Sequence, residues 1–313
     1  MKESIIYQTS SLYRDDFRVK AYTFGSGEKS LCVVGSVRGN EYQQIFLASQ
    51  FVQRMKRLEA EGRLVEGKQV MVIPTLNPSS INIGKRFWAI DNTDINRMFP
   101  GYDQGETTQR IAAGVFEVVN KYSNGIQFSS FYMPGSFLPN VRLTHTGFEN
   151  LEKAADFGLP YVVVRDPHPY DTTTLNYNWQ IWETDAYSLY SSTTKRIDPV
   201  SAKLVLDAAE RFMIKNGIIR GTTSQADPPR IFMDTELIPI RTKTAGLIHL
   251  TVQTGDIVKK GDVCAEVYNT SSGEMIEILT SPADGLVFFL QDEPLVYCCT
   301  AAVKILPELP SEE

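Results

Sequence analysis

The amino-acid sequence predicts two domains of different fold class: an α/β domain with a largely parallel or mixed sheet over residues 1–222, and an all-β domain over residues 231–313. Strand-like and helix-like segments alternate through the first two thirds of the chain, as they do in α/β domains. Residues 221–230 (GTTSQADPPR) are polar, contain paired prolines and are typical of a linker. A chain of 313 residues is long enough for two unequal domains that each bury a core.

Hydrophobic periodicity gives the elements of the α/β domain in order. A short apolar run at 30–35 ends in glycine and predicts a strand, and the segment 42–58 follows it with apolar residues at every third or fourth position, which predicts a helix. The same spacing predicts helices at 105–122 and 200–215. Further strands are expected at 68–76, 125–132, 140–144, 161–165 and 186–191.

The all-β segment contains a weak internal repeat. Residues 246–248 (GLI) precede VKKGDVCAEV at 258–267, and residues 285–287 (GLV) precede VYCCTAAVKI at 296–305. The run GDIVKKGD at 255–262 resembles a half-motif of the biotinyl/lipoyl-like barrel-sandwich domain. That resemblance implies a cofactor-carrying lysine between the halves, and no lysine occurs from residue 261 to residue 303. We therefore expect a structural or oligomerising module, and through it a homo-oligomer.

Charge and composition argue against several classes of partner. Lys and Arg number 31 against 37 Asp and Glu, a net charge of −6, so the chain lacks the basic character of nucleic-acid-binding proteins. No apolar run reaches the ~20 residues of a membrane span, and the N-terminus lacks the apolar core of a signal peptide. Four cysteines without a CxxC pair stand in apolar stretches and are expected to be buried thiols, which favours a cytoplasmic location: Cys32, Cys264, Cys298 and Cys299.

The segment 77–101 is the richest in side chains that bind ligands. It holds Arg86, Asp91, Asp94, Asn96 and Arg97. Two guanidinium forks and an amide suit a ligand carboxylate, because a guanidinium binds a carboxylate through two parallel hydrogen bonds. The alternative is that the two aspartates neutralise the arginines and only stabilise a long loop.

The order of motifs resembles the succinylglutamate desuccinylase/aspartoacylase family. A strand is followed by RGNE at 38–41, a helix, a second strand, NP at 77–78, Arg86 and DINRMFPG at 94–101, and LPNVR follows at 138–142. The resemblance extends over about residues 20–306. It implies a carboxypeptidase-like fold and zinc-dependent amide hydrolysis. It also implies that Arg86 polarises a substrate carbonyl and that Asn96 and Arg97 hold a substrate carboxylate.

The residues that this family uses to bind zinc are replaced. Arg38 stands in place of the first histidine of the HxxE motif, so that only Glu41 is retained, and Ser129 stands in place of the histidine of a DLH motif. Tyr190 stands at the position of the family's general base, a glutamate. A catalytic zinc site uses three protein ligands, and one carboxylate beside a permanent guanidinium charge does not make one. We expect an ion pair between Arg38 and Glu41 at the vacated metal position, and no cofactor.

These substitutions predict a noncatalytic member of the family. Its pocket, with Arg86, Asn96 and Arg97, is expected to bind a small carboxylate such as an amino acid or N-acyl amino acid without hydrolysis. One alternative is a zinc-dependent deacylase or carboxypeptidase with displaced ligands, taken from His145, His168 and either Glu183 or Asp185. Another is a structural or assembly partner of an active paralogue.

Overall fold

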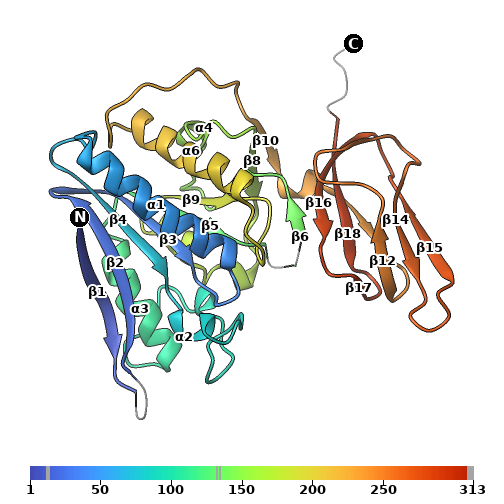
Figure 1. The fold of residues 1–313 in the computed structure, drawn as a ribbon, viewed down its shortest axis with the longest axis horizontal. Helices are drawn as coiled ribbons and strands as arrows, with labels where there is room; N and C mark the ends of the chain where they lie inside the picture. Colours follow the sequence, from blue (N-terminus) through green and yellow to red (C-terminus); the bar gives the residue numbers. More distant parts are fainter. Residues whose placement is uncertain (12–14, 132, 134, 309–313) are drawn as a thin grey trace. The chain divides into compact units, whose positions relative to one another are not determined.

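The computed structural model describes residues 1–11, 15–131, 133 and 135–308 (Figure 1). The chain divides into two compact units, one formed by Met1–Ser130 and Pro139–Ile231, the other by Phe131–Leu138 and Phe232–Glu313. The smaller unit therefore includes a short segment from the middle of the chain. Whether residues 1–222 and 231–313 fold as separate domains stays a prediction.

The larger unit is built on a nine-stranded mixed sheet with the order β1-β2-β4-β3-β5-β9-β7-β8-β10. Strands β4, β3, β5 and β9 run parallel to one another, as do β7 and β8, while β1–β2, β2–β4 and β7–β9 are antiparallel. The predicted α/β class with a large mixed sheet is therefore confirmed. The strands are β1 (Lys2–Thr9), β2 (Phe17–Gly25), β3 (Glu28–Ser36), β4 (Lys68–Thr75), β5 (Asn124–Ser129), β7 (Asn140–Thr144), β8 (Tyr161–Arg165), β9 (Asp185–Tyr190) and β10 (Arg230–Met233).

Helices cover both faces of this sheet and bury one hydrophobic core on each. Helices α1 (Tyr42–Ala60) and α6 (Pro199–Lys215) pack on one face, where Figure 1 shows them side by side. Helices α3 (Thr107–Val119) and α5 (Leu175–Ile181) pack on the other face. Strand β3 supplies both cores, because Leu31 and Val33 belong to one cluster and Cys32 and Val34 to the other. This alternation is the side-chain period of a strand that is buried on both faces.

The short helices lie in the connecting segments. They are α2 (Pro78–Ile81), η1 (Ile95–Arg97), α4 (Leu151–Ala155), η2 (Pro169–Asp171) and, in the smaller unit, η3 (Asp234–Glu236). The hairpin of β1 and β2 was not among the predicted elements, although β2 alternates buried and exposed residues from Phe17 to Ala21. The helix predicted at 105–122 is shorter than expected, since residues 120–122 leave it to approach β5.

The smaller unit contains two antiparallel sheets that share one hydrophobic core. One sheet has the order β11-β18-β16-β13, with β6 paired to β16, and the other has the order β15-β14-β12-β17. These antiparallel sheets confirm the predicted all-β character of this segment. The strands are β6 (Gly135–Phe137), β11 (Ile238–Arg241), β12 (Gly246–Leu250), β13 (Ile257–Val258), β14 (Val263–Tyr268), β15 (Met275–Thr280), β16 (Gly285–Gln291), β17 (Leu295–Val296) and β18 (Ala301–Pro307).

The expectation of four buried cysteines is wrong for two of them. Cys32 and Cys264 are buried, whereas Cys298 and Cys299 are exposed, with their Sγ atoms 3.6 Å apart. The apolar run 296–305 is interrupted by a turn between β17 and β18, in which Cys299 has a φ of +67°. In the described part of the chain, no helix is both long enough and apolar enough to cross a membrane.

Candidate functional site

The candidate site lies at one edge of the large sheet, where three parallel strands end. Strand β3 ends at Ser36 and leads through Arg38 to Glu41, which immediately precedes α1. Strands β5 and β9 end at Ser129 and Tyr190, and these two residues lie opposite each other in the sheet. The carboxyl ends of parallel strands are the usual place for ligand sites in α/β sheets. The fold therefore brings the three substituted positions, Arg38, Ser129 and Tyr190, and the retained Glu41 to one edge.

A glycine allows the long loop of residues 77–101 to approach this edge. A Cβ atom on Gly39 would lie 2.3 Å from the carbonyl carbon of Ser80 and 2.5 Å from the carbonyl oxygen of Lys85. Only glycine permits two backbone segments to lie this close. Gly39 thus packs the segment around α2 directly against the Arg38–Glu41 turn.

Arg38 is buried between two carboxylates. Its Nε donates to both oxygens of Asp94 at 3.1 and 3.0 Å, and its Nη2 donates to Asp94 Oδ2 at 2.9 Å. Its Nη1 donates to Glu41 Oε1 at 3.2 Å, so the ion pair with Glu41 is present, but Asp94 is the principal partner. Burial acts to lower the pKa of the Arg38 guanidinium, but the charges of Asp94 and Glu41 outweigh it and raise that pKa. Arg38 is therefore a fixed cation.

Both oxygens of Glu41 are fully used by the protein. Oε2 accepts hydrogen bonds from the backbone nitrogens of Val37 and Arg38 at 2.8 and 3.0 Å. Oε1 accepts from Arg38 Nη1 and from the hydroxyl of Ser130. Four donors saturate the lone pairs of one carboxylate. The Glu41 side chain is only 3% exposed and has no lone pair left for a metal ion.

The other two positions also lack a strong metal ligand. Ser129 Oγ donates to the carbonyl oxygen of Gln127 at 3.3 Å, and the Tyr190 ring lies 5.3 Å from the Arg142 guanidinium carbon. No group of three His, Cys, Asp or Glu side chains that could hold a metal ion occurs among the described residues. The donors at this edge therefore do not fit the zinc ion that the family resemblance implies.

The displaced-ligand set is not assembled in the described part of the chain either. His145 Nδ1 lies 2.9 Å from Asp166 Oδ1, and His168 stacks on Tyr170. Asp185 is paired with Lys153. The hydrogen bond to Asp166, with Glu149 nearby, raises the pKa of His145, and this shift disfavours the neutral ring that would bind a metal.

Among Arg38, Arg86 and Arg97, Arg86 makes the longest ion pair with a carboxylate of the described residues. Its closest contact with a carboxylate of the described residues is 3.9 Å, from Nη2 to Asp94 Oδ2, and that oxygen is already engaged by Arg38. Its side chain is 25% exposed and lies against the Phe87 ring. Burial and then the positive charge of Arg38 lower the pKa of Arg86. An anion placed here would relieve that repulsion.

Asn96 and Arg97 belong to the short helix η1, which Asp94 caps. Asp94 Oδ1 accepts from the backbone nitrogen of Asn96 at 3.0 Å. Asn96 Oδ1 accepts from the backbone nitrogen of Leu175 at 3.2 Å, which orients the amide. Asp91 pairs with neither arginine, since its Oδ1 accepts from Thr93 within a local turn.

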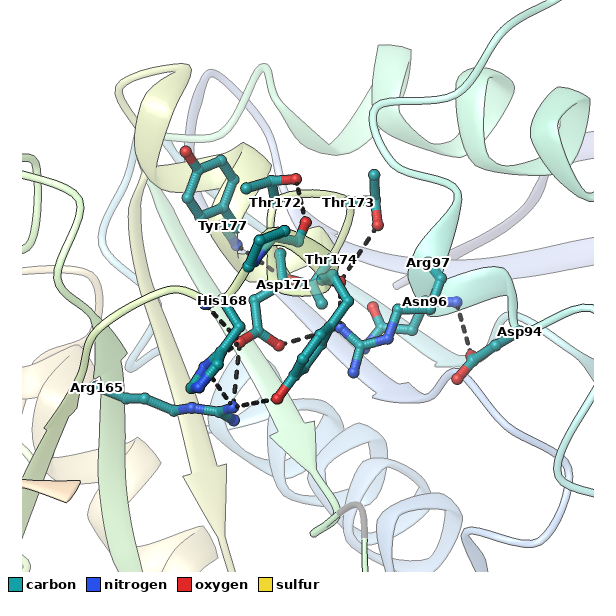
Figure 2. A network of polar contacts seen from close by, with 12 residues as sticks. Asp94, Asn96, Arg97, Arg165, His168, Asp171, Thr172, Thr173, Thr174 and Tyr177 are labelled. Carbon is teal, nitrogen blue, oxygen red and sulfur yellow. Dashed lines mark hydrogen bonds and ion pairs between the residues drawn. The ribbon is translucent and has the colours of Figure 1, made fainter. Parts of the chain in front are cut away.

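Arg97 is held by the loop that follows β8. Its Nη1 donates to Asp171 Oδ1 at 3.1 Å and to the carbonyl oxygen of Tyr170 at 2.6 Å. Figure 2 shows Arg97 and Arg165 approaching Asp171 from opposite sides. Asp171 Oδ2 lies 3.2 Å from Arg165 Nη2 and accepts from the backbone nitrogen of His168 at 3.1 Å. Sequence reasoning did not identify Asp171 as part of the site, because it lies 74 residues from Arg97.

Two sequence comparisons identify relatives of this chain. A sequence model of the succinylglutamate desuccinylase/aspartoacylase catalytic domain matches residues 27–126, which contain β3, β4 and the loop with Arg86, Asn96 and Arg97. The N-alpha-acetyl-L-2,4-diaminobutyric acid deacetylase of Halomonas elongata is 24% identical over 275 residues, which make up 80% of this chain and 73% of that protein.

Solved structures share the fold over nearly the whole chain. A succinylglutamate desuccinylase from Silicibacter sp. TM1040 superposes with a TM-score of 0.81 at 16% identity, covering 97% of this chain and 94% of that one. The product-bound ectoine utilization protein EutE (DoeB) from Ruegeria pomeroyi superposes with a TM-score of 0.77 at 19% identity, covering 93% and 90%. Residues 27–126 are thus similar to the catalytic domain of the succinylglutamate desuccinylase/aspartoacylase family, and nearly the whole chain shares the fold of these solved structures.

Proposed function

We propose that this protein is a member of the family without a zinc centre, and that it binds a small carboxylate, an amino acid or N-acyl amino acid, without hydrolysing it. The observation that carries the proposal is the ion-pair cluster of Arg38 with Asp94 and Glu41. It puts a permanent cation at the edge of the sheet where the resemblance of the RGNE segment to the family's HxxE motif implies zinc ligands. A zinc ion at this place would be repelled by the positive charge of the Arg38 guanidinium.

The loss of zinc removes the usual source of a nucleophile. Zinc in hydrolases lowers the pKa of its bound water to about 7 and polarises the scissile carbonyl. A guanidinium supplies charge, but it does not bind and deprotonate water at neutral pH. A tyrosine at the position of Tyr190 is a poor proton acceptor at neutral pH, compared with the glutamate of the family. The proposal therefore includes no hydrolytic step.

The ligand class follows from the part of the site that is retained. Arg86 offers a guanidinium with no close carboxylate partner among the described residues, and η1 presents Asn96 and Arg97 beside it. The name of the Halomonas elongata relative describes an N-acetylated amino acid as its substrate. An N-acyl amino acid carries the carboxylate that a guanidinium binds through two hydrogen bonds.

For the smaller unit we propose the biotinyl/lipoyl-like barrel-sandwich in a structural role. Support comes from two equivalent turns of the GDIVKKGD run. Asp256 Oδ2 accepts from the backbone nitrogen of Gln253 at 2.8 Å, and Asp262 Oδ2 accepts from that of Lys259 at 2.8 Å. No lysine is available for a tethered cofactor between residues 261 and 303.

The zinc content of tag-free protein, grown and purified with zinc present, tests the first half of the proposal. We expect less than about a tenth of an equivalent in the unmodified protein, since structural and catalytic zinc sites need three or four strong ligands. The double variant Arg38→His/Ser129→His restores two histidines beside Glu41 and is expected to gain zinc. About one equivalent in the unmodified protein, lost in Glu41→Gln, would overturn the proposal.

Ligand-induced stabilisation tests the second half. N-acetyl-L-glutamine at 100 times its Kd is expected to stabilise the protein by about 2.7 kcal/mol, without any change in the ligand. Release of acetate or glutamine in the same sample would instead support the enzyme alternative. No stabilisation by any N-acyl amino acid would refute carboxylate binding.

A further inference from the structure

Cys298 and Cys299 form a pair of adjacent thiols that the proposed function does not use. They stand in the turn between β17 and β18 of the smaller unit. Both side chains are exposed, and their Sγ atoms lie 3.6 Å apart. The other two cysteines, Cys32 and Cys264, are buried. A thiol-binding reagent in solution therefore meets this pair first.

Hydrogen bonds fix the backbone of the turn that carries the pair. The backbone nitrogen of Thr300 donates to the carbonyl oxygen of Tyr297 at 3.1 Å, so the two cysteines are the central residues of a β-turn. The Thr242 hydroxyl donates to the same carbonyl oxygen at 2.6 Å, and the backbone nitrogen of Cys299 donates to the carbonyl oxygen of Thr242 at 2.8 Å. Cys299 has a φ of +67°, which glycine or asparagine usually adopts at this turn position. The turn therefore presents the thiols from a defined conformation.

The spacing of the two thiols suits one bridging atom better than a direct bond. A disulfide needs sulfurs about 2.05 Å apart and Cα atoms usually at least ~4.4 Å apart, whereas adjacent Cα atoms are only ~3.8 Å apart. A tetrahedral atom with bonds of about 2.3 Å to sulfur, as zinc has, holds two sulfurs about 3.8 Å apart. The observed 3.6 Å is close to this second value. The hydrogen bond with the Cys299 thiol also raises the pKa of Cys298, which disfavours the thiolate that attacks a disulfide.

No third strong ligand accompanies the two thiols in the ranges that the structure describes. Glu277 is close enough to act on Cys298 by charge. Its oxygens, however, accept hydrogen bonds from the backbone nitrogens of Lys243 and Thr244 and from the Thr244 hydroxyl. Structural and catalytic zinc sites use at least three protein ligands, so the pair is not expected to retain zinc. It suits an atom that two thiolates satisfy.

We propose that Cys298 and Cys299 form a two-ligand chelating site for trivalent arsenic compounds that carry one organic substituent. Arsenic of this kind is a soft acceptor with two exchangeable positions, and thiolates are soft ligands. When phenylarsine oxide binds, two As–S bonds form, and the two S–H bonds and the bond between arsenic and oxygen break. The oxygen leaves as water with both protons, and arsenic stays trivalent, so no oxidant or reductant takes part. The second As–S bond forms within the complex, which strengthens the binding.

Titration of the full-length native protein with phenylarsine oxide, followed by intact mass, tests the proposal. The protein is reduced beforehand and freed of the reductant. We expect one arsenical per chain, which is retained in excess glutathione, a monothiol, and removed by 2,3-dimercaptopropanol, a dithiol. Cys298→Ser and Cys299→Ser each leave one thiol and are expected to weaken binding at least about hundredfold in competition with glutathione. The matched control is Cys264→Ala, which removes a buried thiol from the same unit and is expected to bind as the unmodified protein does.

Three results would overturn the proposal. The first is an unmodified protein that takes up no arsenical or loses it to glutathione as easily as the single-thiol variants do. The second is undiminished binding in Cys298→Ser, because one thiol or another pair would then suffice. The third is about one equivalent of zinc that is lost in Cys298→Ser and kept in Glu41→Gln, because the pair would then have further ligands. This third result would leave the edge of the large sheet without zinc, so it would not affect the proposed function.

Discussion

Replacing Arg38 by methionine removes the cation from a buried cluster and leaves two carboxylates without it. Arg38 makes four hydrogen bonds to Asp94 and Glu41, at 2.9 to 3.2 Å, and the exposed fractions of these two acidic side chains are 11% and 3%. Methionine is unbranched and apolar, so it fills part of the space without offering a new donor. Asp94 and Glu41 then lose their principal cation while they have little access to water, and Asp94 keeps only the 3.9 Å contact with Arg86 among the arginines described around it.

The expected loss in the free energy of unfolding is about 3–5 kcal/mol, the range for breaking a buried ion pair by removing one partner. Two observations place Arg38→Met in the upper part of that range: both carboxylates lose a partner, and Asp94 loses a fork of three contacts. The additional substitution Asp94→Asn in the Arg38→Met background is expected to recover about 1–2 kcal/mol, because it removes one of the stranded charges. Asp94→Asn alone is expected to be destabilising.

Urea unfolding followed by tryptophan fluorescence measures this loss in the larger unit alone. All three tryptophans, Trp88, Trp179 and Trp182, lie within residues 1–231. The control is Lys203→Met, which breaks an exposed pair with Asp207 on α6 and is expected to cost less than about 0.5 kcal/mol. A loss below about 1 kcal/mol for Arg38→Met, or no recovery with Asp94→Asn, would refute the view that Arg38 compensates these two carboxylates.

Three further outcomes are expected. Arg86→Ala is expected to weaken binding of N-acetyl-L-glutamine at least about tenfold in calorimetry. It is expected to change the free energy of unfolding by less than about 0.5 kcal/mol, because its one ion pair with a described residue is long; unchanged affinity would remove Arg86 from the site. Asp198→Ala removes the N-cap of α6 and is expected to cost about 1 kcal/mol at pH 7. Burial acts to raise the pKa of Asp198, but hydrogen bonds from Ser192, Ser201 and Val200 outweigh it and lower that pKa. The stabilisation by Asp198 is therefore present above the ordinary aspartate pKa of ~3.9 and is lost as the pH falls through the lower pKa of the folded protein. An equal cost of Asp198→Ala in urea unfolding at pH 7 and at about pH 2 would contradict this dependence. A thiol reagent is expected to label Cys298 and Cys299 in the native protein and the two buried cysteines only after unfolding, and intact mass would reveal a different pattern.

Hydrophobic periodicity in the sequence predicted the helices and strands whose buried residues recur at regular spacing. The strands at Asn140–Thr144 and Tyr161–Arg165 lie where their apolar runs predict, and α1 and α6 begin within one residue of the predicted starts. The hairpin of β1 and β2 was missed because β1 is an edge strand with mostly exposed or half-buried residues. An edge strand of this kind carries little hydrophobic periodicity, and its pairing is decided by a partner rather than by its own pattern. The exposure of Cys298 and Cys299 was missed for a related reason, because the apolar composition of residues 296–305 does not reveal the turn between β17 and β18.

The sequence offered candidate residues for this edge of the sheet but not the partners that they contact. The motif at 38–41 predicted that Arg38 pairs with Glu41, three positions further along the chain, whereas the stronger contact of Arg38 is with Asp94, 56 positions away. In the same way, the pattern DINR identified Arg97 as a candidate, but nothing local indicates that Asp171 holds it. Contacts between loops at the end of a sheet depend on the order of the strands, and that order is a property of the whole fold.

These partners change how the retained DINR motif is understood. From the sequence, a structural role for this loop and a ligand-binding role are competing interpretations. In the structure one carboxylate connects the residues of both interpretations, because Asp94 caps η1 through the backbone nitrogen of Asn96, holds the Arg38 fork and lies 3.9 Å from Arg86. The position of Asn96 and Arg97 therefore depends on the same charge that Arg38 compensates. If Asp94 were not held by Arg38, the remaining arginine beside it would be Arg86, 3.9 Å away. Under the proposed function, Arg38 thus leaves Arg86 available for a ligand, because it holds the carboxylate that would otherwise compete for Arg86.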